Sequence, residues 1–263
     1  MGNRQQAFVR VRLAKGGELD GYLSFQQEVG PDVVLYVHGF GSTRGGAKAQ
    51  SLESACARRG WSFAAYDFRG HGRSTGSLME LCGSGLLDDL QAIKDDLLNR
   101  GVRRVFPVGS SMGGWAAGWY AAGRADGIIP AIGMIAPALR FLQRRWETLS
   151  PETRAECLKT GRMRIKSEWV DTEIGIAFAN EIHRFHLDAL ASRWATPLLI
   201  YHGMGDETVP VSDSIEFVER TPFADIELRL LKGGDHRLLP QKDELAEEFC
   251  RFFGRWRVCS KTH

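Results

Sequence analysis

Uninterrupted apolar segments constrain the fold of this sequence more than any other feature. DVVLYVHGF (32–40), WSFAAYDF (61–68), GIIPAIGMIAP (127–137) and TPLLIYHG (196–203) are of this kind. A strand reads as a continuous apolar run when helices cover both faces of its sheet, as in parallel sheets. Helical patterns separate these segments, for example LLDDLQAIKDDLLNR (86–100). The alternation predicts an α/β fold with a mostly parallel central sheet flanked by helices.

The chain divides into a core and one insertion. Its 263 residues, 43% of them hydrophobic, are enough for a large core. AFVRVRL (7–13) and GYLSF (21–25) flank a polar turn, which predicts an opening hairpin. Residues 141–192 are mostly polar with apolar residues at helical spacing, which predicts a small helical cap over the ligand crevice. We therefore expect a core domain built from residues 1–140 and 193–263.

Composition limits the classes of partner. The 34 Lys and Arg against 32 Asp and Glu give a net charge of +2, too little basic excess to predict binding to nucleic acid. The sequence has no apolar run of about 18 residues, so no membrane span is expected. MGNRQQAFVR, at the start, lacks the apolar segment of a secretory signal, and the five scattered cysteines form no C-x-x-C pair. We expect a cytoplasmic protein with reduced thiols, and its oligomeric state stays open.

The segment PVGSSMGGW (107–115) contains the most informative motif. Gly109-Ser110-Ser111-Met112-Gly113 matches G-x-S-x-G between a predicted strand and a predicted small-residue helix, as in a nucleophile elbow. In so tight a turn the residues two positions from the serine must lack side chains. Ser111 is therefore the predicted nucleophile, and Ser110 fills the variable position. Pro107 fits a central strand poorly and predicts a missing ladder hydrogen bond.

A serine hydroxyl needs a base, and the base needs an acid that orients it. In chains with such an elbow, the acid follows the serine in the sequence and the histidine follows the acid. Asp206 in YHGMGDETVP and His236 in LLKGGDHRLL both lie just beyond predicted strands, at the edge where a crevice is expected. Asp213 and Asp235 are rival acids. Asp206 is preferred because Asp235 adjoins the histidine and Asp213 falls within a predicted helix.

The segment HGFGS (38–42) follows the third predicted strand and offers backbone N–H groups to a developing oxyanion. The expected donors are the N–H groups of Phe40 and Met112, one from each loop. His38 is expected to brace this loop. His202, in a strand, is expected to lie in the core or behind the site.

Three side chains are candidates for substrate contact: Arg44, Trp146 and Trp169. For Arg44 the alternative is a solvated surface charge, and for the tryptophans it is packing of the cap onto the core. His183 and His186 lie three residues apart, but nothing supplies further ligands at metal-site spacing. We therefore expect no metal and no organic cofactor.

Five segments, in order, resemble the α/β-hydrolase superfamily: HGF (38–40), YDFRGHGRS (66–74), GSSMGG (109–114), GMGDETVP (203–210) and GGDH (233–236). Residues 38–60 resemble, more narrowly, small serine hydrolases that include mitochondrial acyl-glucuronide esterases and palmitoyl-protein thioesterases. The resemblance implies cleavage of carboxylic esters or thioesters through an acyl-enzyme formed by a Ser-His-Asp triad. It does not fix the substrate. Peptide or amide cleavage by the same triad, and a non-enzymatic ligand-binding or signalling role, stay open.

Overall fold

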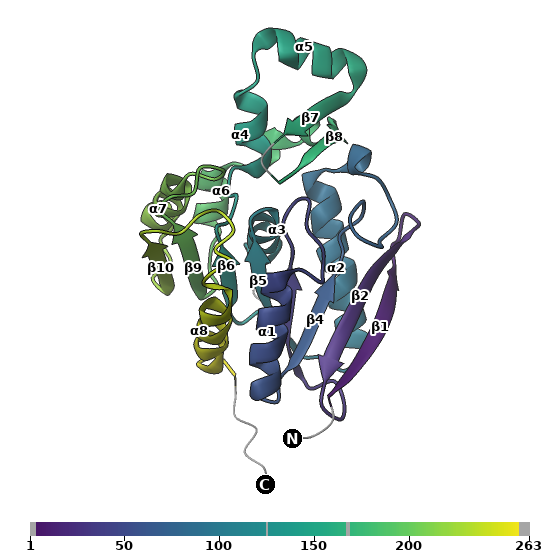
Figure 1. Cartoon of the computed structure of the whole chain (residues 1–263), viewed down its shortest axis with the longest axis vertical. Coiled ribbons are helices and arrows are strands. Elements are labelled where there is room, and N and C mark those ends of the chain that lie inside the picture. Colours follow the sequence, from purple (N-terminus) through teal and green to yellow (C-terminus); the bar gives the residue numbers. More distant parts are fainter. Residues whose placement is uncertain (1–3, 125, 167–168, 258–263) are drawn as a thin grey trace.

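A computed structural model describes residues 4–124, 126–166 and 169–257 and contains an eight-stranded sheet with helices on both faces (Figure 1). Its strands are β1 (Gln5–Arg12), β2 (Glu18–Phe25), β3 (Asp32–Val37), β4 (Ser62–Tyr66), β5 (Arg104–Ser110), β6 (Ile132–Ile135), β9 (Leu198–Gly203) and β10 (Ile226–Leu231). They lie in the order β1-β2-β4-β3-β5-β6-β9-β10. Strands β4 to β10 of this order run parallel, whereas β2 is antiparallel to both neighbours. The predicted hairpin and mostly parallel sheet are confirmed.

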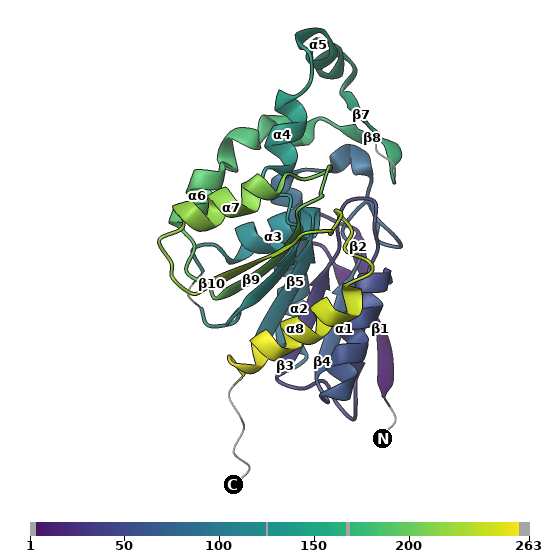
Figure 2. The same cartoon turned by 60° about the vertical axis from the view of Figure 1, so that its left-hand side comes forward.

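Two layers of helices cover the sheet. Helices α1 (Ala47–Arg58) and α8 (Lys242–Gly254) pack on one face, and α2 (Gly83–Asn99), α3 (Met112–Ala121) and α7 (Val211–Arg220) pack on the other (Figures 1 and 2). Strand β3 shows why both layers are needed. Val33, Leu35 and Val37 point into the α2–α3 side of the core, and Val34 and Tyr36 point into the α1–α8 side. The uninterrupted apolar segments of the sequence thus follow from burial on two faces.

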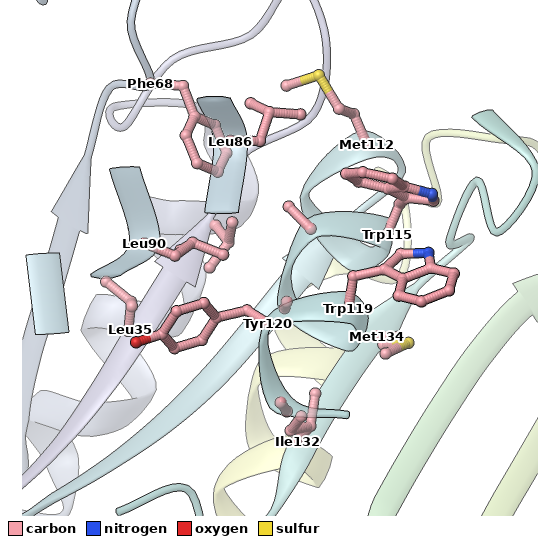
Figure 3. Close-up of a cluster of buried hydrophobic side chains, with 14 of the residues drawn as sticks. Leu35, Phe68, Leu86, Leu90, Met112, Trp115, Trp119, Tyr120, Ile132 and Met134 are labelled. Carbon is pink, nitrogen blue, oxygen red and sulfur yellow. The ribbon is translucent and has the colours of Figure 1, made fainter. Parts of the chain in front are cut away.

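Helix α3 is buried along its whole length and leads directly from the end of β5. Figure 3 shows Trp115 and Trp119 on one side of α3, with Tyr120 and Leu90 on the other. The ring of Trp115 lies 5.0 Å from that of Phe185, in an edge-to-face arrangement. A helix fixed on all sides in this way gives the residue that precedes it a defined position.

Pro107 lies within β5 and is buried. The N–H groups of Val105 and Ser111 donate to Ile128 and Ile135, on the side of β5 that faces β6. Alternation along the strand puts position 107 on that same side, one residue before the pairing with β6 begins at Val108. The absent proline N–H therefore falls where the ladder has not yet started, which accounts for the expected gap.

The insertion projects beyond the carboxyl ends of the strands (Figures 1 and 2). It contains α4 (Phe141–Glu147), α5 (Pro151–Thr160), β7 (Arg162–Lys166), β8 (Asp171–Gly175), the 3-10 turns η2 (Ala177–Asn180) and η3 (Ile182–Arg184), and α6 (Leu187–Ser192). The antiparallel ribbon β7–β8 differs from the expected all-helical cap. Met163 and Ile165 are buried between exposed neighbours, which is the period of a strand. The segment expected to end the cap, α6, packs against α7 of the core.

Two expectations drawn from composition, on the cysteines and on membrane spans, can be compared with the structure. Within the described residues the cysteines are free thiols, and the closest pair, Cys56 and Cys250, has its sulfur atoms 3.9 Å apart. Cys259 lies outside the described residues. No described helix combines the length and apolar character that a bilayer crossing requires.

Candidate active site

Ser111 stands between β5 and α3 in a strained backbone conformation, with φ 53° and ψ −117°. The flanking glycines leave room for this turn. A Cβ atom at Gly109 would lie 2.4 Å from the carbonyl oxygen of Gly113, and one at Gly113 would lie 2.1 Å from that of Val37. A side chain at either position would therefore collide with the backbone, which is the steric reason for the G-x-S-x-G spacing expected in a nucleophile elbow. Ser110 is buried, away from the pocket.

The structure brings His236 and Asp206 to Ser111 from two other loops. His236 follows β10, and its Nε2 lies 3.1 Å from the Ser111 hydroxyl oxygen. Its Nδ1 lies 2.7 Å from Oδ2 of Asp206, which follows β9. Ser111 and Asp206 are 95 positions apart along the chain, and Asp206 and His236 are 30 apart. They meet because the carboxyl ends of parallel strands lie at the same edge of the sheet.

The Asp206 side chain has no exposed surface. Its Oδ1 accepts hydrogen bonds from the N–H groups of Thr208 (2.9 Å) and Val209 (2.8 Å). Burial opposes the charge, but hydrogen bonds from His202 and His236 outweigh burial and hold the pKa of Asp206 well below its usual range. This carboxyl group is therefore ionised at neutral pH.

The rival acids are engaged elsewhere. Asp213 is buried on α7 and accepts hydrogen bonds from Arg140 and Arg144. Asp235 caps a turn by accepting from the N–H of Leu238 at 2.7 Å. The geometry thus supports the preference for Asp206.

The loop after β3 lies against the serine. A Cβ atom at Gly39 would be 3.2 Å from Cβ of Ser111, which places the N–H of Phe40 close to the elbow. His38 is fully buried, donates from Nδ1 to the Gly39 carbonyl at 2.8 Å, and accepts at Nε2 from the N–H of Phe68 at 3.0 Å. Burial, together with the neighbouring His71, lowers the pKa of His38 to about 3, so the ring is neutral at pH 7.

The N–H of Met112 opens α3 on the other side of the serine. The first N–H groups of a helix have no partner within the helix. Within the described residues, neither Phe40 nor Met112 donates its N–H to a protein acceptor. Both groups are therefore available to bind an oxyanion.

A pocket of about 330 Å³ opens at Ser111 and His236. Its apolar wall comes from the loop after β3, the cap and the loop after Asp206, and includes Phe40, Phe141, Ile165, Trp169 and Val209. Arg140, just before the cap, and Arg144 and Arg145 of the cap add a basic side. A larger groove of about 570 Å³ lies between β1 and α2, but most residues that line it are charged or polar and none belongs to the triad.

The three candidates for substrate contact have different positions. Trp169 lines the pocket and is 50% exposed. The guanidinium carbon of Arg237 lies 4.6 Å from the centroid of the Trp169 ring. Trp146 is buried and packs edge-to-face on Phe178, outside the pocket lining, so the expected contact is corrected to cap packing.

Arg44 also lies outside the pocket lining. Its guanidinium donates to Oδ2 of Asp20 at 2.6 and 2.8 Å, and its backbone N–H donates to Asp67 at 2.7 Å. Neither expected reading of Arg44 holds: the side chain is neither a substrate contact nor a solvated surface charge, because these carboxylates hold it in a largely buried ion pair.

Sequence reasoning missed the arginines around the start of α4. Arg140, which immediately precedes the helix, and Arg144 within it are four residues apart, and both bind Asp213. That spacing was visible in the sequence, but the partner on α7 was not. It follows that the basic side of the pocket depends on tertiary contacts.

Metal-ligating side chains do not gather in the part of the chain that the structure describes, where no group of three or more His, Cys, Asp or Glu could hold an ion. His183 and His186 are exposed. The nearby carboxylates have other partners, since Glu181 binds the first turn of α2 and Asp188 pairs with Arg220.

The sequence of the chain matches a known family over most of its length. Residues 31–243 match the family described as serine aminopeptidase, S33. The chain belongs to the serine aminopeptidase S33 family. The mouse mitochondrial palmitoyl-protein thioesterase ABHD10 is 30% identical over 213 residues, which cover 80% of this chain and 70% of the mouse protein. The human protein of the same name is 27% identical, over 80% of this chain and 68% of its own.

Solved structures of similar fold agree with this S33 membership. A putative hydrolase from Agrobacterium vitis superposes with a TM-score of 0.82 at 25% identity, over 95% of this chain and 98% of the other. Mouse ABHD10 superposes with a TM-score of 0.80 at 26% identity, over the same shares. Three predictions are confirmed: the α/β-hydrolase fold, the resemblance to the subgroup of small serine hydrolases that includes palmitoyl-protein thioesterases, and the assignment as a hydrolase.

Proposed function

We propose that this protein hydrolyses carboxylic esters or thioesters through an acyl-enzyme formed on Ser111. One observation carries the proposal: the His236 ring lies within hydrogen-bond distance of both Ser111 (3.1 Å) and Asp206 (2.7 Å). A serine with a base at this distance, and a base with a buried carboxylate behind it, fit the requirements of nucleophilic catalysis.

In the first half-reaction, His236 Nε2 takes the proton of Ser111 as its oxygen attacks the acyl carbon. The N–H groups of Phe40 and Met112 stabilise the resulting oxyanion, and His236 then gives the proton to the departing alcohol or thiol. Water repeats these steps on the acyl-enzyme, releasing the acid and restoring Ser111. Asp206 keeps Nδ1 of His236 protonated throughout and stabilises the imidazolium.

The pocket favours an acyl group of moderate size. Its volume is about 330 Å³. At roughly 30 Å³ for each water-sized group, it holds on the order of ten non-hydrogen atoms. The S33 relatives named palmitoyl-protein thioesterases support an acyl substrate. A palmitoyl chain would exceed this volume, so we expect shorter acyl groups to be turned over faster.

The family description also raises aminopeptidase activity as a second candidate. An aminopeptidase needs an anionic group for the substrate's ammonium. Among the described residues that line the pocket, the one carboxylate, Asp213, is already paired with Arg140 and Arg144. The basic character of the remaining wall disfavours a positively charged amine, which supports the ester and thioester assignment.

Ser111→Ala provides the test. We expect kcat for short-chain p-nitrophenyl esters to fall by a factor of about 10⁴ or more, because nucleophile and base act as a unit. Thioesters and amino-acid amides, assayed in parallel, separate the two candidates. The matched control is Ser110→Ala, which removes the adjacent buried hydroxyl.

A fluorophosphonate probe followed by peptide mapping checks the same residue without a substrate. The label should attach to Ser111 in the wild type and in Ser110→Ala, and to neither serine in Ser111→Ala. Unchanged turnover or labelling in Ser111→Ala would reject the proposed nucleophile. Slow single-turnover hydrolysis with tight retention of the ligand would favour a binding role instead.

A further inference from the structure

The Asp206 carboxylate receives a fourth hydrogen bond from a residue outside the triad. Oδ1 accepts from the N–H groups of Thr208 and Val209, and Oδ2 accepts from His236. Oδ2 also lies 3.2 Å from Nε2 of His202. An ionised carboxylate offers about four lone-pair sites. With no exposed surface and four donors, the group is fully satisfied by protein alone.

His202 is itself held from both sides. It lies near the end of β9, with no exposed surface. Nε2 faces Asp206 and, at 3.1 Å, the carbonyl oxygen of Val209. Both are acceptors, so this nitrogen must carry a proton. Nδ1 lies 2.8 Å from the Ser214 hydroxyl on α7, which donates to it when the ring is neutral.

We propose that His202 is a positioning residue of this site, whose Nε2–H holds the Asp206 carboxylate in the orientation that binds His236. The inference rests on the proposed hydrolase function. Without this donor, Oδ2 would keep an unfilled lone pair in a dry environment, and one of the four contacts that fix the carboxylate against the imidazole would be lost. Since His202 is absent from the described pocket lining, its loss acts on kcat rather than KM.

Two substitutions at this position separate the donor from the rest of the side chain. The amide nitrogen of His202→Gln reaches the place of Nε2 and keeps the bond to Asp206. The shorter amide of His202→Asn reaches only the place of Nδ1, next to Ser214. We expect kcat to fall by about 10- to 100-fold in His202→Asn, the usual effect of losing an outer-shell partner. His202→Gln should stay within about threefold of the wild type, and KM should change little in both.

Ser51→Ala is the control for a partly buried hydrogen bond lost elsewhere, since the buried Ser51 donates to Asp243 between α1 and α8. It should lower stability without changing kcat. Equal losses of kcat in His202→Gln and His202→Asn, or no loss in either, would overturn the proposal.

A measurement on the wild-type protein keeps the proposal testable if a variant does not fold. Histidine ¹⁵N shifts report which ring nitrogens carry protons. At pH 7 the Nε2 of His202 should be protonated, and a ring lacking that proton overturns the proposal whatever the substrate is. Failure of the proposed function is a separate result, because it would appear as turnover that survives Ser111→Ala.

Discussion

The triad rim, meaning the loops that carry Ser111, Asp206 and His236, and the cap face each other across one pocket but are held in different ways. In the rim, Asp206 has no exposed surface and His236 is only 16% exposed. In the cap, helix α5 buries a single residue, Cys157, and the outward side chains of β7 are exposed. Saturated buried hydrogen bonds hold the rim, whereas the outer part of the cap, α5 and β7, buries only Cys157, Met163 and Ile165.

We expect this difference to assign the chemical step to the rim and substrate selectivity to the cap. A triad requires fixed geometry, because small displacements of reacting groups are costly in rate. The cap meets the rim through Phe141, whose ring is 6.1 Å from that of Phe40, and through the arginines on Asp213. Substitutions in the rim should therefore change kcat and the free energy of unfolding together, and substitutions in the cap should act mainly on KM.

The largest effect is expected at the elbow. Gly113→Ala would place a Cβ atom 2.1 Å from the backbone oxygen of Val37, so the turn must shift. We expect a loss of about 3 kcal/mol or more in the free energy of unfolding. Displacement of Ser111 should lower kcat at least about 100-fold. Urea denaturation and ester turnover measure the two quantities.

Gly254→Ala is the matched control, since no atom lies within 4 Å of the added methyl group. It should leave both quantities nearly unchanged. The comparison between rim and cap would break down if Gly113→Ala behaved like this control.

The rim could be predicted from the sequence because its signals are local. Glycine spacing around Ser111 specifies the elbow, and Asp206 and His236 each follow an apolar run. Parallel strands then bring these separate loops to one edge of the sheet. The position of His202 in the core or behind the site was expected, but its hydrogen bond to Asp206 could not be predicted, because nothing in a buried strand indicates which side chain a histidine will bind.

The cap was less predictable because its signals are short or long-range. The period-two pattern of Arg162–Lys166 covers only five residues, too few to separate a strand from the surrounding helical pattern. Trp146 finds its partner Phe178 through the folding of the insertion. The partners of Arg44 are likewise distant in sequence, and no local pattern indicates them.

Acid should separate the loop after β3, which lies against Ser111, from the cap. The pKa of His38 is about 3 in the folded protein and about 6.5 in the unfolded chain. The unfolded state therefore binds more protons in this range, so stability is lost as the pH falls below 6.5. Between pH 7 and pH 5 this group alone should lower the free energy of unfolding by about 2 kcal/mol. The cap histidines His183 and His186 are exposed and should contribute little.

Urea denaturation at the two pH values measures this loss, and the ring resonances of His38 should stay those of a neutral imidazole down to about pH 4.5. In His38→Gln the pH dependence should become shallower by the same amount. An unchanged slope in that variant would show that the acid sensitivity arises elsewhere.

The smallest effects are expected where the cap is held by ion pairs. Asp213→Asn removes a buried charge that binds Arg140 and Arg144, and both arginines are partly exposed. Solvent screening of the arginines reduces the loss to about 1–2 kcal/mol. The melting temperature should fall by about 2–4 °C for each kcal/mol. Because Asp213 lines the pocket without touching the triad, KM should change more than kcat.

Arg164→Ala tests the same kind of contact in the exposed ribbon. Arg164 pairs with Asp171 at 2.7 Å, but its side chain is 65% exposed and lies outside the pocket lining. An exposed ion pair contributes little because water and salt screen it, so the free energy of unfolding should change much less than in Asp213→Asn. Thermal melts at low and high salt would measure both variants. If Arg164→Ala cost as much as Asp213→Asn, the ribbon would be as tightly integrated as the rim, and the cap could not be regarded as the looser of the two regions.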